Sequence, residues 1–82
     1  MKRSMKMALA DAEPHGLSKV HGGYKARDAR GEIYAFAALH SPQTIRALHD
    51  RALLDFWGPE KAACLTQLGS ERLEELRAEA GQ

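Results

Sequence analysis

The residues best suited to chemistry are one cysteine and four histidines, and their spacing predicts no metal centre. Zinc sites typically pair their ligands as Cys-x-x-Cys or His-x-x-x-His, and no pair among His15, His21, His40, His49 and Cys64 is spaced in that way. A thiolate pair of Cys64 with His40 or His49 is the only nucleophilic arrangement the chain offers, but a lone cysteine between apolar neighbours is typical of a core. The sequence also lacks a phosphate-binding loop and a nucleophile elbow. We therefore expect no metal, no cofactor and no enzymatic activity.

A second set of chemically capable residues is basic. Lys25 and Arg27 are two positions apart, so they would share one face of a strand, with Arg30 at the following turn and Lys19 upstream. A basic two-stranded ribbon can enter a major groove or follow phosphates. These four cations therefore support one function hypothesis, a small DNA- or RNA-binding protein.

Charge is unevenly distributed along the chain. The net charge is only +1, but residues 1–30 carry seven Lys/Arg against three Asp/Glu, whereas residues 31–82 carry five against eight. Such polarity suits either mutual attraction of the two halves or a basic surface for nucleic acid or an acidic partner.

Length and composition predict one small domain over residues 1–82. Apolar residues make up 44% and charged residues 28%, which is ordinary for a folded protein. A chain of this size buries only about 60–65% of its unfolded surface, so self-association would help it. A single cysteine fits a reducing compartment, and no apolar run approaches the roughly 18–20 residues of a membrane span. We therefore expect a cytoplasmic protein without a membrane contact.

The segment that must position these residues is Ser41–Gly58, which predicts a central helix over 42–57. Ser41 is a good N-cap and Pro42 suits the first helical position, while Gly58 followed by proline predicts the end. One apolar stripe recurs at three- and four-residue intervals and predicts the buried face, with His49 half-buried on it and bonded to a backbone carbonyl. The stripe comprises Ile45, Leu48, Ala52, Leu53 and Phe56.

The same helix has apolar residues outside that stripe. Leu54 would point nearly opposite to it with Trp57 to its side, near Arg51. We interpret these three residues as a partner-binding face. They support the leading function hypothesis, a small non-enzymatic regulatory or adaptor protein that acts through protein–protein contact or self-association, like accessory or inhibitor proteins of phages and plasmids.

The other elements complete an α+β prediction. Asp28–Gly31 reads as a tight reversal and predicts a basic hairpin over about 20–39, with the apolar run Ile33–Leu39 in the core. Alanine-rich segments keep open a helix at 24–40 and hence an all-α bundle of four or five short helices. Two further helices are predicted at 59–68 and 71–80, while residues 1–16 could form a frayed or loosely packed arm.

Overall fold

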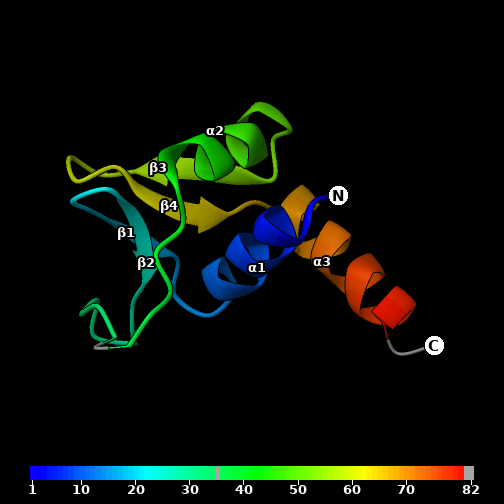
Figure 1. Ribbon diagram of the computed structural model, residues 1–82, viewed down its shortest axis with the longest axis horizontal. Coiled ribbons are helices and arrows are strands. Elements are labelled where there is room, and N and C mark those ends of the chain that lie inside the picture. Colours follow the sequence, from blue (N-terminus) through cyan, green and yellow to red (C-terminus); the bar gives the residue numbers. More distant parts are fainter. Residues whose placement is uncertain (35, 81–82) are drawn as a thin grey trace.

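The computed structural model describes residues 1–34 and 36–80 as three helices and a four-stranded antiparallel sheet. The α+β class is therefore confirmed, and the all-α bundle is wrong. Figure 1 shows two β-hairpins whose tips lie at one end of the molecule, with α3 at the other end. The elements in chain order are α1 (Arg3–Ala12), β1 (Leu17–Val20), β2 (Gly23–Ala26), α2 (Pro42–Asp50), β3 (Leu54–Trp57), β4 (Ala62–Leu65) and α3 (Gln67–Ala80).

The sheet joins two local hairpins through one long-range contact. Its strand order is β2-β1-β4-β3, so each hairpin pairs neighbours in sequence and β1 meets β4 where Leu17 lies opposite Ala63. Side chains alternate between the two faces of each strand. Leu17, Tyr24 and Leu54 are buried, on the face that the helices cover.

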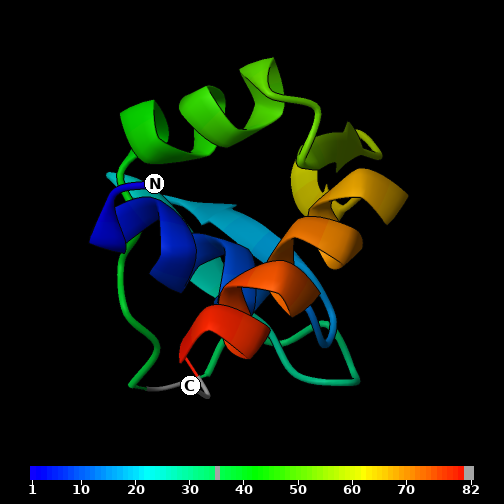
Figure 2. The same ribbon diagram turned by 90° about the vertical axis from the view of Figure 1, so that its right-hand side faces the viewer.

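Helix α1 belongs to the core. Met5, Ala8, Leu9 and Ala12 are all buried and recur at the spacing of one helical stripe. The prediction of a loose N-terminal arm is therefore wrong, because small Ala8 provides the position that completes the stripe. Figure 2 shows α1 lying beside α3. At this contact Arg77 donates to both carboxylate oxygens of Glu13, at 2.6 and 3.0 Å.

Helix α2 begins where the sequence predicts and ends seven residues earlier than Trp57. Ser41 Oγ accepts the Thr44 N–H at 3.2 Å, which confirms the N-cap. At the other end the Ala52 N–H donates to the His49 carbonyl and the Leu53 N–H donates to that of Leu48. This pair of bonds is a Schellman motif, and Ala52 takes the required left-handed conformation with φ +61°. The helix predicted over 42–57 is therefore wrong beyond Asp50, because an alanine ends it where glycine is usual.

We predict that Ala52→Gly stabilises the protein. A left-handed conformation costs a non-glycine residue about 1–2 kcal/mol, whereas glycine adopts it freely at a cost of about 0.5–1 kcal/mol in unfolded-chain entropy. Because Ala52 is exposed, its methyl group contributes little packing. The expected net gain in the free energy of unfolding is about 0.5–1 kcal/mol, measured by urea denaturation. A loss of stability would contradict this account of how α2 ends.

The segment after α2 forms the second hairpin. Phe56 lies opposite Ala63 and Trp57 opposite Ala62, across a turn over 58–61 closed by a bond from the Lys61 N–H to the Gly58 carbonyl. The helix predicted at 59–68 is therefore wrong. Ala62–Leu65 has good helix formers, but as a strand it fills the central position between β1 and β3, which outweighs weak propensity.

Helix α3 confirms a helix at 71–80 but starts earlier, at Gln67. Thr66 is the N-cap: its Oγ1 accepts the Gly69 N–H at 2.9 Å and donates to the Ala52 carbonyl at 2.6 Å. Gly69 lies in the first turn against the carbonyl group of Leu53, and a Cβ there would overlap the carbonyl oxygen. The absent side chain thus lets α3 approach the end of α2.

The predicted hairpin over 20–39 is right about the reversal and wrong about the strands. The Asp28 Oδ1 accepts the Arg30 and Glu32 N–H groups, and Gly31 has φ +83°, so Asp28–Gly31 is the expected turn. The regular hairpin is β1–β2, however, and among the described residues the returning chain pairs with it through two isolated bridges, Arg27 with Ile33 and Tyr24 with His40.

The prediction that 33–39 lies in the core is also wrong. The described apolar side chains larger than alanine in this segment are exposed to 42% for Ile33, 50% for Tyr34, 100% for Phe36 and 53% for Leu39. The segment runs outside the sheet, beyond the edge strand β2, and the helices that fill the core cover the sheet elsewhere. Burial therefore depended on position in the sheet rather than on hydropathy.

Candidate nucleic-acid interface

A groove of about 820 Å³ lies between α2 and the tips of the two hairpins. In Figure 1 both tips lie at the same end of the molecule as the start of α2. Strands β1 and β2, helix α2 and the turn after β3 all contribute to its walls. The lining residues are Lys19, Val20, Gly22, Gly23, Tyr24, Pro42, Ile45, Arg46, His49, Asp50, Phe56, Gly58 and Lys61.

Three cations from three elements surround this groove. Lys19 lies opposite Tyr24 in the first hairpin, Arg46 is exposed on α2, and Lys61 ends the turn of the second hairpin. Within residues 1–34 and 36–80, none of the three forms an ion pair. Asp50 is the one carboxylate of the lining. The groove therefore presents an excess of positive charge that the protein itself does not neutralise.

The floor of the groove is aromatic. Tyr24 is buried, and its ring centroid lies 6.1 Å from that of Phe56. Burial raises the pKa of the Tyr24 hydroxyl, because low-dielectric surroundings disfavour the phenolate. His49 stacks on Phe56 with 4.7 Å between centroids and is 42% exposed. Stacking on Phe56, rather than the predicted bond to a backbone carbonyl, thus positions His49.

The exposed side of α2 carries side chains of the kind that read bases. Ile45 and Leu48 are buried, whereas Gln43 and Arg46 face outward from the first half of the helix. Glutamine pairs well with adenine and arginine with guanine in the major groove, and the N-terminal residues of a reading helix make such contacts.

The four cations predicted from the sequence do not form one surface. Lys19 lies at the groove, but Lys25 pairs with Ser18 on the opposite face of the hairpin. The Arg27 Nε donates to the His15 carbonyl at 2.7 Å, and Arg30 lies exposed in the turn after β2. The sequence alone predicts Arg46 and Lys61 in two different helices and therefore does not bring them together with Lys19. The glycine–proline step at 58–59 was a usable turn signal.

The predicted partner-binding face is also dispersed. Leu54 is buried with 1% of its surface exposed, whereas Trp57 is 63% exposed. Arg51 is exposed beyond the end of α2, where its Nη1 lies 3.8 Å from the Met5 sulfur. Leu54 therefore belongs to the core, and its predicted role in binding is wrong.

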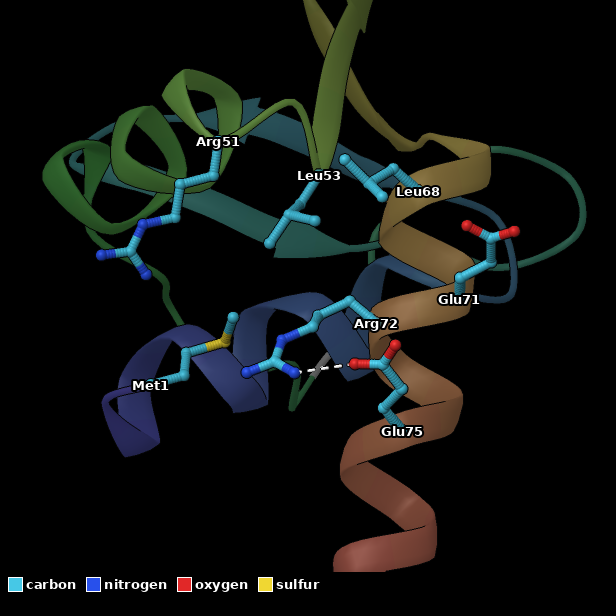
Figure 3. Close-up of a pocket in the computed structure, with 7 residues that line it drawn as sticks. All are labelled: Met1, Arg51, Leu53, Leu68, Glu71, Arg72 and Glu75. Carbon is cyan, nitrogen blue, oxygen red and sulfur yellow. Dashed lines mark hydrogen bonds and ion pairs between the residues drawn. The ribbon is translucent and has the colours of Figure 1, made fainter.

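Arg51 lines a second pocket, of about 440 Å³, shown in Figure 3. Leu53 and Leu68 lie at one end of this pocket, while Arg72 extends from α3 toward α1 and bonds to Glu75 at 2.8 Å. The lining has two arginines and two glutamates, so it shows no preference for an ion of either sign.

Other reactive side chains do not assemble into a site. His40, 6% exposed, places its Nε2 2.6 Å from Asp11 Oδ2 and so fastens the chain before α2 to α1. Cys64 is a free, half-buried thiol. Nowhere in residues 1–34 and 36–80 do three or more His, Cys, Asp or Glu side chains gather as they would around a metal ion. No helix in these ranges combines the length and apolar character needed to cross a membrane.

Comparison of the chain with protein-family models, curated proteins and solved structures finds no match.

Proposed function

We propose that this protein binds duplex DNA through the groove between α2 and the two hairpin tips. The observation that carries the proposal is the convergence of Lys19, Arg46 and Lys61 around that groove, with no ion-pair partner for any of them in the part of the chain that the structure describes. Neutralising phosphates releases condensed counterions, and this supplies most of the non-specific affinity of a DNA-binding protein.

The shape of this end of the molecule favours a duplex. Helix α2 projects Gln43 and Arg46, and a B-form major groove about 12 Å wide admits one helix. Both hairpin tips project beyond the start of α2 (Figure 1), so Lys19 and Lys61 would meet phosphates while α2 faces base edges. Single-strand binders use exposed aromatic rings for stacking, whereas the tyrosine and phenylalanine that line this groove are covered: Tyr24 is 7% exposed and Phe56 is half-buried.

Charge elsewhere on the molecule is consistent with this orientation. Helix α3 carries four glutamates, at positions 71, 74, 75 and 79, against two arginines. It lies at the end away from the hairpin tips (Figure 1). A DNA molecule at the groove would thus meet the cations and avoid these carboxylates.

The test is binding to a fluorescent duplex, measured by anisotropy from low to moderate salt. We expect an association constant whose logarithm falls with the logarithm of salt at a slope near −1.8, since the phosphate contacts of Lys19 and Lys61 contribute about −0.9 each. Lys19→Gln with Lys61→Gln should reduce the slope by about 1.8. Lys19→Glu, Arg46→Glu and Lys61→Glu together should abolish binding.

Lys25→Glu is the matched control, because it makes the same charge change on the opposite face of the same hairpin. At about 0.1 M salt this variant should bind DNA about as tightly as the unmodified protein. At that concentration, salt largely screens exposed charges that lie more than about 10 Å apart. No binding at low salt, or equal weakening by Lys25→Glu and Lys19→Glu, would refute the proposal.

A second candidate function, binding of a protein, has one specific observation in its favour. Phe36 is fully exposed, beside half-exposed Tyr34. This feature lies on a different part of the chain from the basic groove.

A further inference from the structure

Phe36 is the most exposed large apolar residue of the described chain. It projects from the segment beyond β2, where the Ala37 N–H donates to the Tyr34 carbonyl at 3.2 Å. Phe36 is 100% exposed, Tyr34 50% and Met7, on α1, 47%. At roughly 200 Å² for a large side chain, these three expose about 400 Å² of mainly apolar surface. The largest apolar patch of a typical monomer covers about 300–600 Å² and is often functional, so this patch is a candidate contact surface.

A groove of about 730 Å³ lies beside this projecting ring. One wall is the exposed side of α1, with Met7, Ala10 and Pro14, which follows the helix. The other wall includes Tyr34 and Phe36 itself. Pockets of about 300–1,000 Å³ accept ligands larger than one phenyl ring. A projecting ring and a groove able to receive it thus lie together on one face.

The charges bordering this face balance. The turn that leads to it alternates Arg27, Asp28, Arg30 and Glu32, and residues 33–39 carry no charge. Two copies of this face can meet without net repulsion, with an arginine of one turn near an acidic residue of the other. The basic groove around Lys19 would instead repel its own copy.

We infer that this face binds a second copy of the same chain, with Phe36 of each protomer inserted into the groove of the other. A twofold contact requires a patch that complements itself, and the adjacent ring and groove satisfy that requirement. Both apolar patches together supply about 800 Å², which is below the roughly 1,200 Å² at which stable specific interfaces begin and is in the range of weak, transient contacts. The expected dimer is weak, with a dissociation constant on the order of 10 µM.

This inference does not depend on DNA binding, and sedimentation equilibrium without DNA tests it. At about 100 µM most chains should be dimeric if the dissociation constant is on the order of 10 µM, with twice the chain mass of 9.0 kDa. Phe36→Asp should give a folded monomer, since the ring has no contact to lose within its own chain. Trp57→Asp is the control, because Trp57 is also an exposed aromatic residue, 63% exposed, but lies on strand β3 of the second hairpin. The Trp57→Asp protein should stay dimeric. A monomeric wild type, a dimeric Phe36→Asp or a monomeric Trp57→Asp would overturn the inference.

Disulfide trapping tests which surfaces meet. In a Cys64→Ser background, Phe36→Cys and Met7→Cys proteins are mixed and oxidised. Insertion of residue 36 into the groove of the partner predicts the mixed disulfide as the main cross-linked product. Equal random pairing, or no cross-link at concentrations that give a dimer by sedimentation, would contradict this geometry.

Discussion

Gly69→Ala is expected to destabilise the protein by about 3 kcal/mol, although the substitution raises helix propensity. In an open helix, alanine would gain about 0.5–1 kcal/mol over glycine. At Gly69 the added Cβ would overlap the carbonyl oxygen of Leu53 and lie 3.1 Å from the Leu65 Cδ1. The Leu53 carbonyl also accepts the Thr66 N–H at 3.2 Å, so moving it away would weaken the start of α3. Overpacking of this kind costs about 1–3 kcal/mol and sometimes more.

The measurement is thermal and urea unfolding followed by circular dichroism. At about 4–8 °C per kcal/mol for a domain of this size, the midpoint should fall by roughly 12–24 °C. Glu74→Ala is the matched control, since position 74 is exposed in the same helix, and it should change the free energy of unfolding by less than about 0.5 kcal/mol. An unchanged or raised midpoint in Gly69→Ala would show that α3 does not approach Leu53 so closely.

Leu54→Glu should unfold the protein rather than disrupt a partner surface. Leu54 is 1% exposed in the core. Loss of a buried leucine side chain costs about 2–5 kcal/mol, and a buried carboxylate without a partner adds a further penalty. Small domains have a total stability of about 5–15 kcal/mol, and a thin core falls at the low end. We expect the circular dichroism signal and cooperative melting to be lost.

Two control variants show whether the expected unfolding comes from placing a charge in the core rather than from changing this side chain or adding a charge elsewhere. Leu54→Met conserves volume and should cost less than about 1.5 kcal/mol. Trp57→Glu introduces the same charge at a residue 63% exposed and should leave the fold intact. On a helix Leu54 and Trp57 would be neighbours, whereas on a strand residues three apart point to opposite faces. A folded Leu54→Glu with a cooperative melt would contradict the position of Leu54 in β3.

Structural features that depend on a few adjacent residues, such as helix starts and tight turns, were predictable from the sequence. Ser41 and Pro42 begin α2, and Asp28–Gly31 makes its turn, because capping and turn bonds join groups only two to four positions apart. The α+β class followed from such local signals. The stripe of α1 was equally local, but recognising it required counting Ala8 as apolar.

Only the tertiary structure decided that residues 54–57 and 62–65 are strands rather than helices. Both segments contain apolar and helix-forming residues, and what makes them strands is pairing with each other and with Leu17, far away in sequence. The candidate site has the same origin. Lys19, Arg46 and Lys61 are separated by 27 and 15 positions, and no local pattern connects them. Two of the histidines first considered for chemistry have structural contacts instead, with His40 bonded to Asp11 and His49 stacked on Phe56. The sequence alone determined the number of charged residues and the local turns. The fold determined which cations lie together at the groove, because their proximity depends on packing between distant segments.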